Sequence, residues 1–141
     1  MKVTWEGIYK FDNPRIQKMV GFDHTNYTII VDTFDNKFEG TVTDDISTGG
    51  MEGTGKIIGS LKGTSISFKK FMPVGDRFID WEGNREKTNK KHSTLYYSGT
   101  LSANGKEASG SWTFGYKLGF LFGIIPLPYH GGKGIWSMQK V

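Results

Sequence analysis

The chain has 141 residues, of which 23% are charged and 14% aromatic, which is typical of one folded domain and excludes a disordered tail. Its net charge is only +4, and part of the basic charge gathers in residues 85–91 beside Glu86, so we expect no nucleic-acid partner. The absence of cysteine excludes disulfides, thiol catalysis and Cys-based zinc sites.

The hydrophobic residues do not form long runs. None reaches the roughly 18 apolar residues that a membrane-spanning helix needs. The first residues, Met1 to Gly7, enter a strand-like pattern at once and contain no hydrophobic signal region. We therefore expect no transmembrane segment and a cytoplasmic location.

The chain opens with a strand predicted over residues 3–11, because large and small apolar residues occupy every second position. Asp12-Asn13-Pro14 follows, and this combination caps a helix and suits its first turn. Ile16, Met19 and Val20 then recur at helical spacing before Gly21. The spacing predicts one short helix over residues 14–20, which could close one end of the sheet structure, with an irregular connection as the alternative.

A hairpin is predicted next. Residues 27–33 and 37–44 alternate as strands around the tight turn Asp35-Asn36, and the second strand places Phe38, Gly40, Val42 and Asp44 on one face. Asn104-Gly105 is a second strong hairpin signal. Further strands are predicted at residues 55–62, 64–72, 77–83, 94–101, 107–116 and 133–140.

Eight to ten strands in short-range succession, with one short helix, predict an all-β protein. The fold class that fits is an antiparallel up-and-down β-barrel forming a single domain over residues 1–141. Glycine is abundant, at 20 of 141 residues, and recurs on the predicted inward faces, where strong strand coiling and large neighbouring rings leave room for little else. These inward glycines are 7, 40, 59, 83, 99, 110 and 134.

Three stretches carry a resemblance to a known group of folds. They are Trp-Glu-Gly-Ile-Tyr at residues 5–9, Tyr-Ser-Gly-Thr-Leu at 97–101 and Gly-Ile-Trp-Ser-Met at 134–138. With the strand pattern, they resemble the calycin-like barrels: lipocalins, fatty-acid-binding proteins and streptavidin. The lipocalin signature has Gly-x-Trp in its first strand, whereas here the first strand runs Trp-x-Gly and Gly-x-Trp closes the chain. The resemblance implies small apolar ligands as a class.

Two charged residues fall on predicted inward faces. Asp44 ends its strand and could bind a polar group of a ligand at the barrel mouth, but an aspartate there more often caps its own turn, which is the favoured interpretation. Lys70 lies between Phe68 and Met72 and could meet an anionic head group, or it could be paired. Beside Lys69, it is more simply interpreted as a strand end that reaches water.

No catalytic or metal motif is present. His24, His92 and His130 lie in predicted loops without metal-ligand spacing, and there is no nucleophile elbow or phosphate-binding loop. We therefore predict no metal, no cofactor and no catalytic residue. The protein is expected to be a binding protein rather than an enzyme.

The segment 118–129 is apolar on both alternating faces, so it is either buried on both sides or meets something other than water. Phe120, Phe122 and Ile124 are candidates for a homo-oligomer contact or for covering a barrel end. The alternative is an ordinary strand packed under a loop.

The leading functional hypothesis is a barrel that binds a small, largely apolar molecule. A packed interaction barrel that uses segment 118–129 as its contact is the second hypothesis, and an enzyme at the barrel mouth is the third. A filled interior, with Trp5, Trp112 and Trp136 in mutual contact, would favour the second. The predicted ligand-binding residues are Trp5, Tyr9, Tyr27, Phe38, Asp44, Phe68, Lys70, Tyr97, Trp112 and Trp136.

Overall fold

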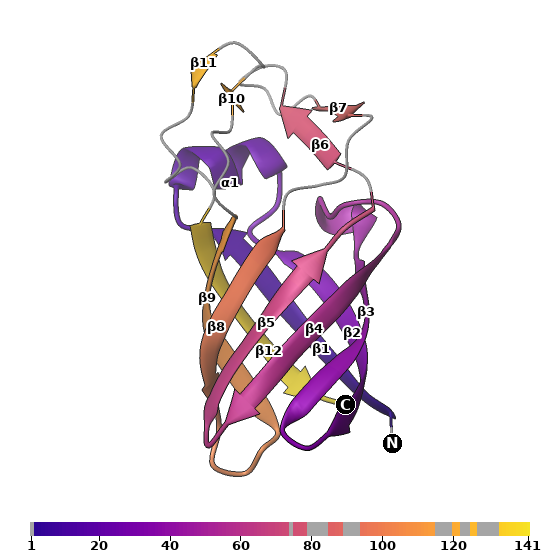
Figure 1. Ribbon diagram of the computed structural model, residues 1–141. Coiled ribbons are helices and arrows are strands. Elements are labelled where there is room, and N and C mark those ends of the chain that lie inside the picture. The colour runs from indigo at the N-terminus through magenta and orange to yellow at the C-terminus, as the bar shows by residue number, and fades with distance from the viewer. Residues whose placement is uncertain are drawn as a thin grey trace.

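In the computed structural model, eight antiparallel strands close into a barrel in the order β1-β12-β9-β8-β5-β4-β3-β2 (Figure 1). The structure describes residues 2–73, 94–113 and 133–141 with their side chains, and the backbone of residue 114 and of four short strands. The barrel strands are β1 (Lys2–Phe11), β2 (Thr25–Phe34), β3 (Lys37–Asp44), β4 (Thr54–Lys62), β5 (Ser65–Phe71), β8 (Leu95–Leu101), β9 (Glu107–Phe114) and β12 (Lys133–Lys140).

The predicted up-and-down barrel with one short helix is confirmed. Every neighbouring pair of barrel strands is antiparallel, and β1 closes the barrel against β12. Helix α1 (Pro14–Val20) has the predicted bounds: the Asn13 side chain accepts hydrogen bonds from two amide groups of its first turn, and Gly21 ends it in the left-handed conformation at φ 89°. The turn Asp35-Asn36 joins β2 to β3 with positive φ at both residues, as tight hairpins require.

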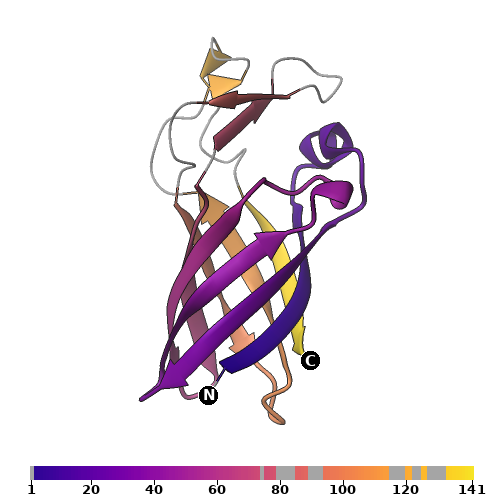
Figure 2. The ribbon, with the colours of Figure 1, turned by 90° about the vertical axis from the view of Figure 1, so that its right-hand side faces the viewer.

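The two ends of the barrel are built differently. At one end the connections are short turns: Asp35-Asn36, the turn at Gly63, and the turn over residues 102–106. The other end carries α1, the 3₁₀ helix η1 (Ile46–Thr48) and the two longest connections, from β5 to β8 and from β9 to β12. Two small antiparallel sheets, β6 (Gly75–Phe78) with β7 (Arg85–Thr88) and β10 (Phe120–Leu121) with β11 (Ile125–Pro126), lie beyond this end (Figures 1 and 2).

Several predictions fall outside the described residues. The predicted strand 77–83 is described only as far as Phe78, in β6, so Gly83 lies outside. The same holds for residues 115 and 116 of the predicted strand 107–116. Of the predicted oligomer contact, the backbone of Phe120 lies in β10, whereas Phe122 and Ile124 are not described.

The core alternates rings and glycines along the inward faces, as period two predicts. A side chain at Gly7 would overlap the hydroxyl of Tyr27 and the backbone carbonyl of Ser137. The same space is used by the Tyr27 hydroxyl, which donates a hydrogen bond to that carbonyl at 3.1 Å. The missing side chain at position 7 therefore makes room for the tyrosine.

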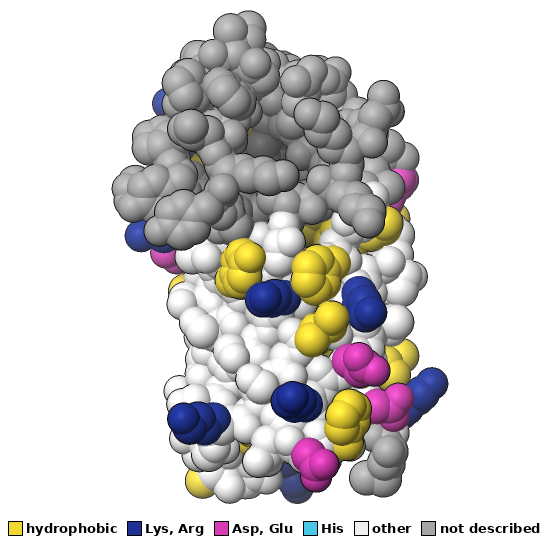
Figure 3. Space-filling view, viewed as in Figure 1, with side chains coloured by type: hydrophobic (Ala, Val, Ile, Leu, Met, Phe, Trp, Pro, Cys, Tyr) yellow, Lys and Arg dark blue, Asp and Glu magenta, His cyan; other side chains and the backbone are white. Residues whose placement is uncertain are grey.

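The outer surface mixes lysines with exposed apolar side chains. Tyr96, Lys69 and Ile58 are consecutive cross-strand neighbours on β8, β5 and β4, and Phe71 pairs with Lys56 in the adjoining row. Hydrophobic and basic side chains are accordingly interleaved across the front of the barrel in Figure 3. Isolated apolar residues among charges are ordinary for a sheet surface.

Replacing Gly7 with Val should destabilise the fold by about 1–3 kcal/mol or more, because the new side chain overlaps Tyr27 and the Ser137 carbonyl in a packed interior. Urea unfolding measures the change. Glu6→Val, at the exposed neighbouring position of the same strand, is the matched control. Equal free energies of unfolding for the two variants would show that Tyr27 and the Ser137 backbone shift to accommodate a side chain at position 7.

Candidate functional site

A buried ion pair lies inside the barrel near the end with the long connections. Asp44 is the last residue of β3 and Lys70 is next to last in β5, and both strands end on the same side of the barrel (Figure 1). Lys70 Nζ lies 2.7 Å from Asp44 Oδ1, and the two residues are 1% and 3% exposed. The alternation of each strand had placed both residues inward, and this part of the sequence interpretation is confirmed.

The favoured interpretations of both residues were wrong. Asp45, not Asp44, caps the turn: its carboxylate accepts from the Ser47 amide at 2.9 Å and from the Ser47 hydroxyl at 2.6 Å, which lowers the pKa of Asp45. Likewise Lys69 is exposed on the outer face, whereas Lys70 does not reach water. The physical reason is that an inward charge can stay buried when an opposite charge on another strand pairs with it.

The carboxylate of Asp44 is well supplied with donors. Besides Lys70 on Oδ1, its Oδ2 accepts from the Tyr9 hydroxyl at 2.9 Å and from the Met51 amide at 3.3 Å. These donors come from β1, from β5 and from the loop before β4. The negative charge is therefore held by groups that the fold itself supplies, and Asp44 is fixed in place.

The ammonium of Lys70 is less well supplied. It has three N–H donors, yet Asp44 Oδ1 is its one hydrogen-bond acceptor within the described part of the chain. Its other neighbours are rings: Nζ lies 4.7 Å from the Tyr9 ring centroid and 6.0 Å from that of Tyr27, where cation–π attraction offsets part of the lost hydration. Burial lowers the pKa of Lys70, and the neighbouring Asp44 opposes that shift.

Two further buried tyrosines, Tyr27 and Tyr97, lie in the same interior. Tyr27 donates to the Ser137 carbonyl, and burial, with Asp44 nearby, raises its pKa. Tyr97 is 3% exposed, and burial raises its pKa well above the usual value, with smaller contributions from Tyr9, Tyr27 and Asp44. No hydrogen bond of the Tyr97 hydroxyl is formed with any residue that the structure describes. Within the described residues, the spare donors beside the ion pair are therefore those of Lys70.

A layer of aromatic rings lies below the pair, toward the short-turn end. Phe68 stacks on Tyr97 at 4.6 Å and meets the Trp136 ring edge-on at 5.4 Å. The Trp136 indole N–H donates to the carbonyls of Ser98 and Ser111 at 3.2 and 3.0 Å, and the Trp112 indole N–H donates to that of Ile135 at 3.2 Å. The indole donors are therefore committed to the wall, and the rings of Phe68, Tyr97 and Trp136 form a floor beneath Lys70, the ring floor.

The ten predicted ligand-binding residues all face or border the interior. Eight of them are buried, whereas Trp5 and Phe38 are half-buried and pack against the core. Trp5 makes no ring contact with Trp112 or Trp136 in the described structure, so the three indoles are not in mutual contact. Whether any of the ten binds a ligand stays a prediction. The Met51 amide and the Ser137 carbonyl were missed, because backbone groups leave no signal in a sequence.

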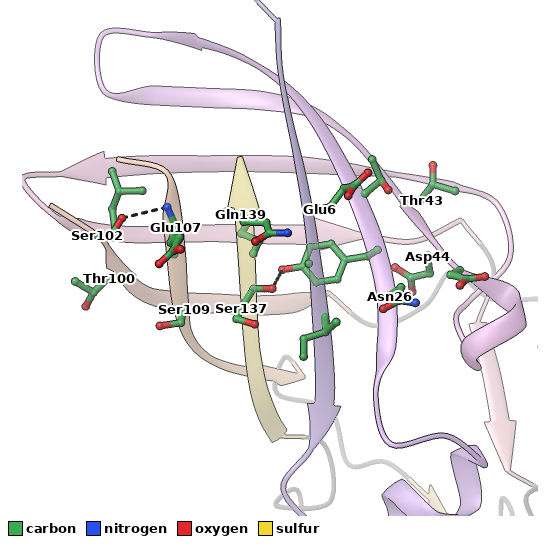
Figure 4. Close-up of a pocket in the computed structure, with 18 residues that line it drawn as sticks. Glu6, Asn26, Thr43, Asp44, Thr100, Ser102, Glu107, Ser109, Ser137 and Gln139 are labelled. Atoms are coloured by element: carbon green, nitrogen blue, oxygen red, sulfur yellow. Dashed lines mark hydrogen bonds between the residues drawn. The ribbon is translucent and has the colours of Figure 1, made fainter. Parts of the chain in front are cut away.

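A polar hollow lies on the outside of the barrel wall, across β8, β9, β12, β1, β2 and β3. Glu6 on β1 pairs with Gln139 on β12 and with Thr28 on β2, and Gln139 pairs with Glu107 on β9. Figure 4 shows these outward side chains spread across neighbouring strands, beside the Tyr27–Ser137 hydrogen bond. They are short polar or acidic groups on exposed positions, as is usual for the wet face of a sheet, and we assign them no chemistry.

The comparisons with protein families and curated proteins assign neither a family nor a function to the chain. No protein-family model and no curated protein matches the chain. None of the described helices is long and apolar enough to cross a membrane. Over the same residues, no three His, Cys, Asp or Glu side chains come together as a metal site would require; His24 lies just before β2, and His92 and His130 are outside the described residues.

Removing one partner of the ion pair should cost much more than removing both. Asp44→Asn leaves an uncompensated buried ammonium and should lower the free energy of unfolding by about 3–5 kcal/mol. The double variant Asp44→Leu with Lys70→Met should recover most of that loss, because two apolar side chains need no partner. Chemical denaturation of the three proteins measures both values. A double variant no more stable than the single one would contradict the expectation.

The free energy of unfolding should fall as the pH rises above about 10, where an unfolded tyrosine loses its proton. The pKa values of Tyr27 and Tyr97 are raised in the fold, so the folded protein keeps protons that the unfolded chain releases. Tyr97→Phe should make this fall shallower. Unfolding in urea at about pH 9 and about pH 11 measures the slope.

Tyr96→Phe is the matched control, since Tyr96 is the exposed neighbour on the same strand. The opposite pH contribution of Lys70, whose pKa is lowered, raises stability with pH until about 10.5, where the unfolded lysine loses its proton. This contribution of Lys70 is the same in the wild type and in both variants, so it cancels when their slopes are compared. Identical slopes for the three proteins would show that Tyr97 ionises as easily folded as unfolded.

Proposed function

We propose that this protein is a calycin-like binding barrel for a small, largely apolar molecule with one polar group that accepts hydrogen bonds. The ligand is held above the ring floor, at the barrel end with the long connections. One observation carries the proposal: the buried Lys70–Asp44 pair has surplus donors and stands inside an otherwise apolar interior.

A purely structural core gives no reason for this pair. Two apolar side chains of similar size would fill the same space without the cost of removing two charges from water, and such replacements are often neutral or stabilising. Apolar walls with a few placed polar groups are the usual composition of a small-molecule site. The retained pair therefore favours a site in which the polar group of a ligand completes the hydrogen bonding of Lys70.

The position of the pair supports the same function. Short turns close the opposite barrel end, whereas the pair lies at the end from which the connections β5–β8 and β9–β12 leave. Long connections on a rigid scaffold are where binding sites usually lie. The ring floor of Phe68, Tyr97 and Trp136 limits how deep a ligand can go.

The test compares two ligands of one shape, acetylnaphthalene and ethylnaphthalene, by displacement of the fluorescent probe N-phenylnaphthylamine. Both should displace it at saturable stoichiometry, and acetylnaphthalene should bind roughly tenfold more tightly, as one additional hydrogen bond implies. The preference should vanish in the double variant Asp44→Leu with Lys70→Met, which keeps the apolar walls. Failure of both compounds and of the probe to bind would overturn the proposal.

A further inference from the structure

We propose that copies of this protein associate side by side through two faces of the barrel that lie opposite each other and carry opposite charge. One face is the polar hollow on the outer wall. The other, here called the lysine face, consists of the outward side chains of β4, β5 and β8. The hollow of one copy receives the lysine face of the next copy. This contact lies on the outside of the barrel, and it does not depend on the binding function proposed above.

The hollow has a volume of about 1130 Å³ and an acidic lining. Glu6, Asp45 and Glu107 line it from the outer surface, and none of its described lining residues is a lysine or arginine. Glu6 and Glu107 are exposed, and neither forms an ion pair with another described residue. Hydrogen bonds from a neighbouring serine lower the pKa of Asp45, which therefore stays charged. A fourth carboxylate, Asp44, is already paired with Lys70, so three negative charges face outward without a partner in the lining.

The lysine face has the opposite charge. Lys56, Lys62 and Lys69 point outward from β4 and β5, and the sequences of β4, β5 and β8 contain no aspartate or glutamate. All three lysines are exposed, and none forms an ion pair with a residue that the structure describes. Lys69 Nζ lies 5.7 Å from the ring centroid of Tyr96 on the neighbouring strand. Basic side chains are visible across this side of the barrel in Figure 3.

The closed topology places the two faces on opposite sides of the molecule. In the ring of eight strands, β5 is four strands from β1 in either direction, and β4 is four strands from β12. Glu6 lies on β1, whereas Lys69 and Lys56 lie on β5 and β4. A contact between two different surfaces is head-to-tail, and it continues into an open row of copies unless the rotation closes a ring.

A second copy is the partner that the charges favour, because one chain supplies both halves of the contact. Three carboxylates of the hollow face three ammonium groups of the lysine face. Both sets extend along the barrel: Glu107 and Lys62 adjoin turns at the short-turn end, whereas Asp45 and Lys69 lie toward the end with the long connections. Two copies with parallel barrel axes therefore bring opposite charges together at both ends of the contact. Such complementarity selects the partner and its orientation.

Sedimentation velocity of the purified protein, from about 1 µM to about 1 mM, tests the association. Exposed ion pairs are weak and are screened by salt. The mean mass should therefore rise steadily with protein concentration at about 10 mM ionic strength, where the Debye length is about 30 Å. At about 1 M, where it is about 3 Å, the protein should be monomeric. A protein that is monomeric under both conditions would overturn the proposal.

Two charge-reversal variants test which faces meet. Glu6→Lys with Glu107→Lys makes the hollow basic, and Lys56→Glu with Lys69→Glu makes the lysine face acidic. Each variant then presents two faces of like charge, which should weaken its self-association by roughly tenfold or more. An equimolar mixture should associate again, because the basic hollow of one variant meets the acidic face of the other. A mixture that stays monomeric would show that the two faces do not meet.

Lys18→Glu with Lys133→Glu is the matched control. It changes the net charge by the same amount as the acidic-face variant, at exposed positions outside the hollow and the lysine face. The control should associate as strongly as the wild type, and far-ultraviolet circular dichroism checks that each variant keeps the barrel. Equal loss of association in the control and in the acidic-face variant would mean that overall charge drives the contact, and the proposal would be wrong.

An anionic membrane is the alternative partner of the lysine face. Vesicles of phosphatidylserine and phosphatidylcholine, compared with phosphatidylcholine alone, distinguish it in a pelleting assay. If the wild type is monomeric at low salt and pellets only with the anionic vesicles, and Lys56→Glu with Lys69→Glu abolishes pelleting, the face binds lipid and self-association is wrong.

Discussion

The positive charge of Lys70 inside the barrel is the constraint on which the rest of the site depends. An ammonium removed from water must regain several kcal/mol from its surroundings, or it loses its proton. Here Asp44 provides one strong hydrogen bond and the rings of Tyr9 and Tyr27 provide cation–π contact. This compensation is incomplete for the lysine and nearly complete for the aspartate. Because Lys70 keeps unused N–H donors while the Asp44 carboxylate is saturated, the site favours a ligand group that accepts hydrogen bonds.

The aromatic interior depends in turn on glycine. The Tyr27 hydroxyl occupies the place of a missing side chain at Gly7, and the Trp112 ring does the same at Gly134. In a small barrel, inward side chains from opposite walls compete for the same volume, so large rings require small partners. This exchange of volume lets the rings of Tyr9 and Tyr27 pack against one ion pair.

Alternation along each strand was enough to predict the barrel, the helix cap and the inward direction of Asp44 and Lys70. It could not predict that they meet. They lie 26 residues apart on β3 and β5, with β4 between them, and period two assigns a face but not a height across the barrel. The usual preferences of aspartate for turns and of lysine for water therefore decided the interpretation. Those preferences describe Asp45 and Lys69 correctly and fail for the residue beside each.

The difference between the two barrel ends shows how one fold can hold both a stable core and a buried ion pair. At the short-turn end the chain reverses in a few residues, which restricts the unfolded chain little and fixes strand register. The ring floor then separates that half from Lys70, because its indole donors are bonded to the wall and its rings pack on one another. Changes at the ion pair should therefore leave the strand pairing below the floor undisturbed. The ring floor therefore allows the end with the long connections to hold Lys70, although the lysine uses only part of its hydrogen-bonding capacity.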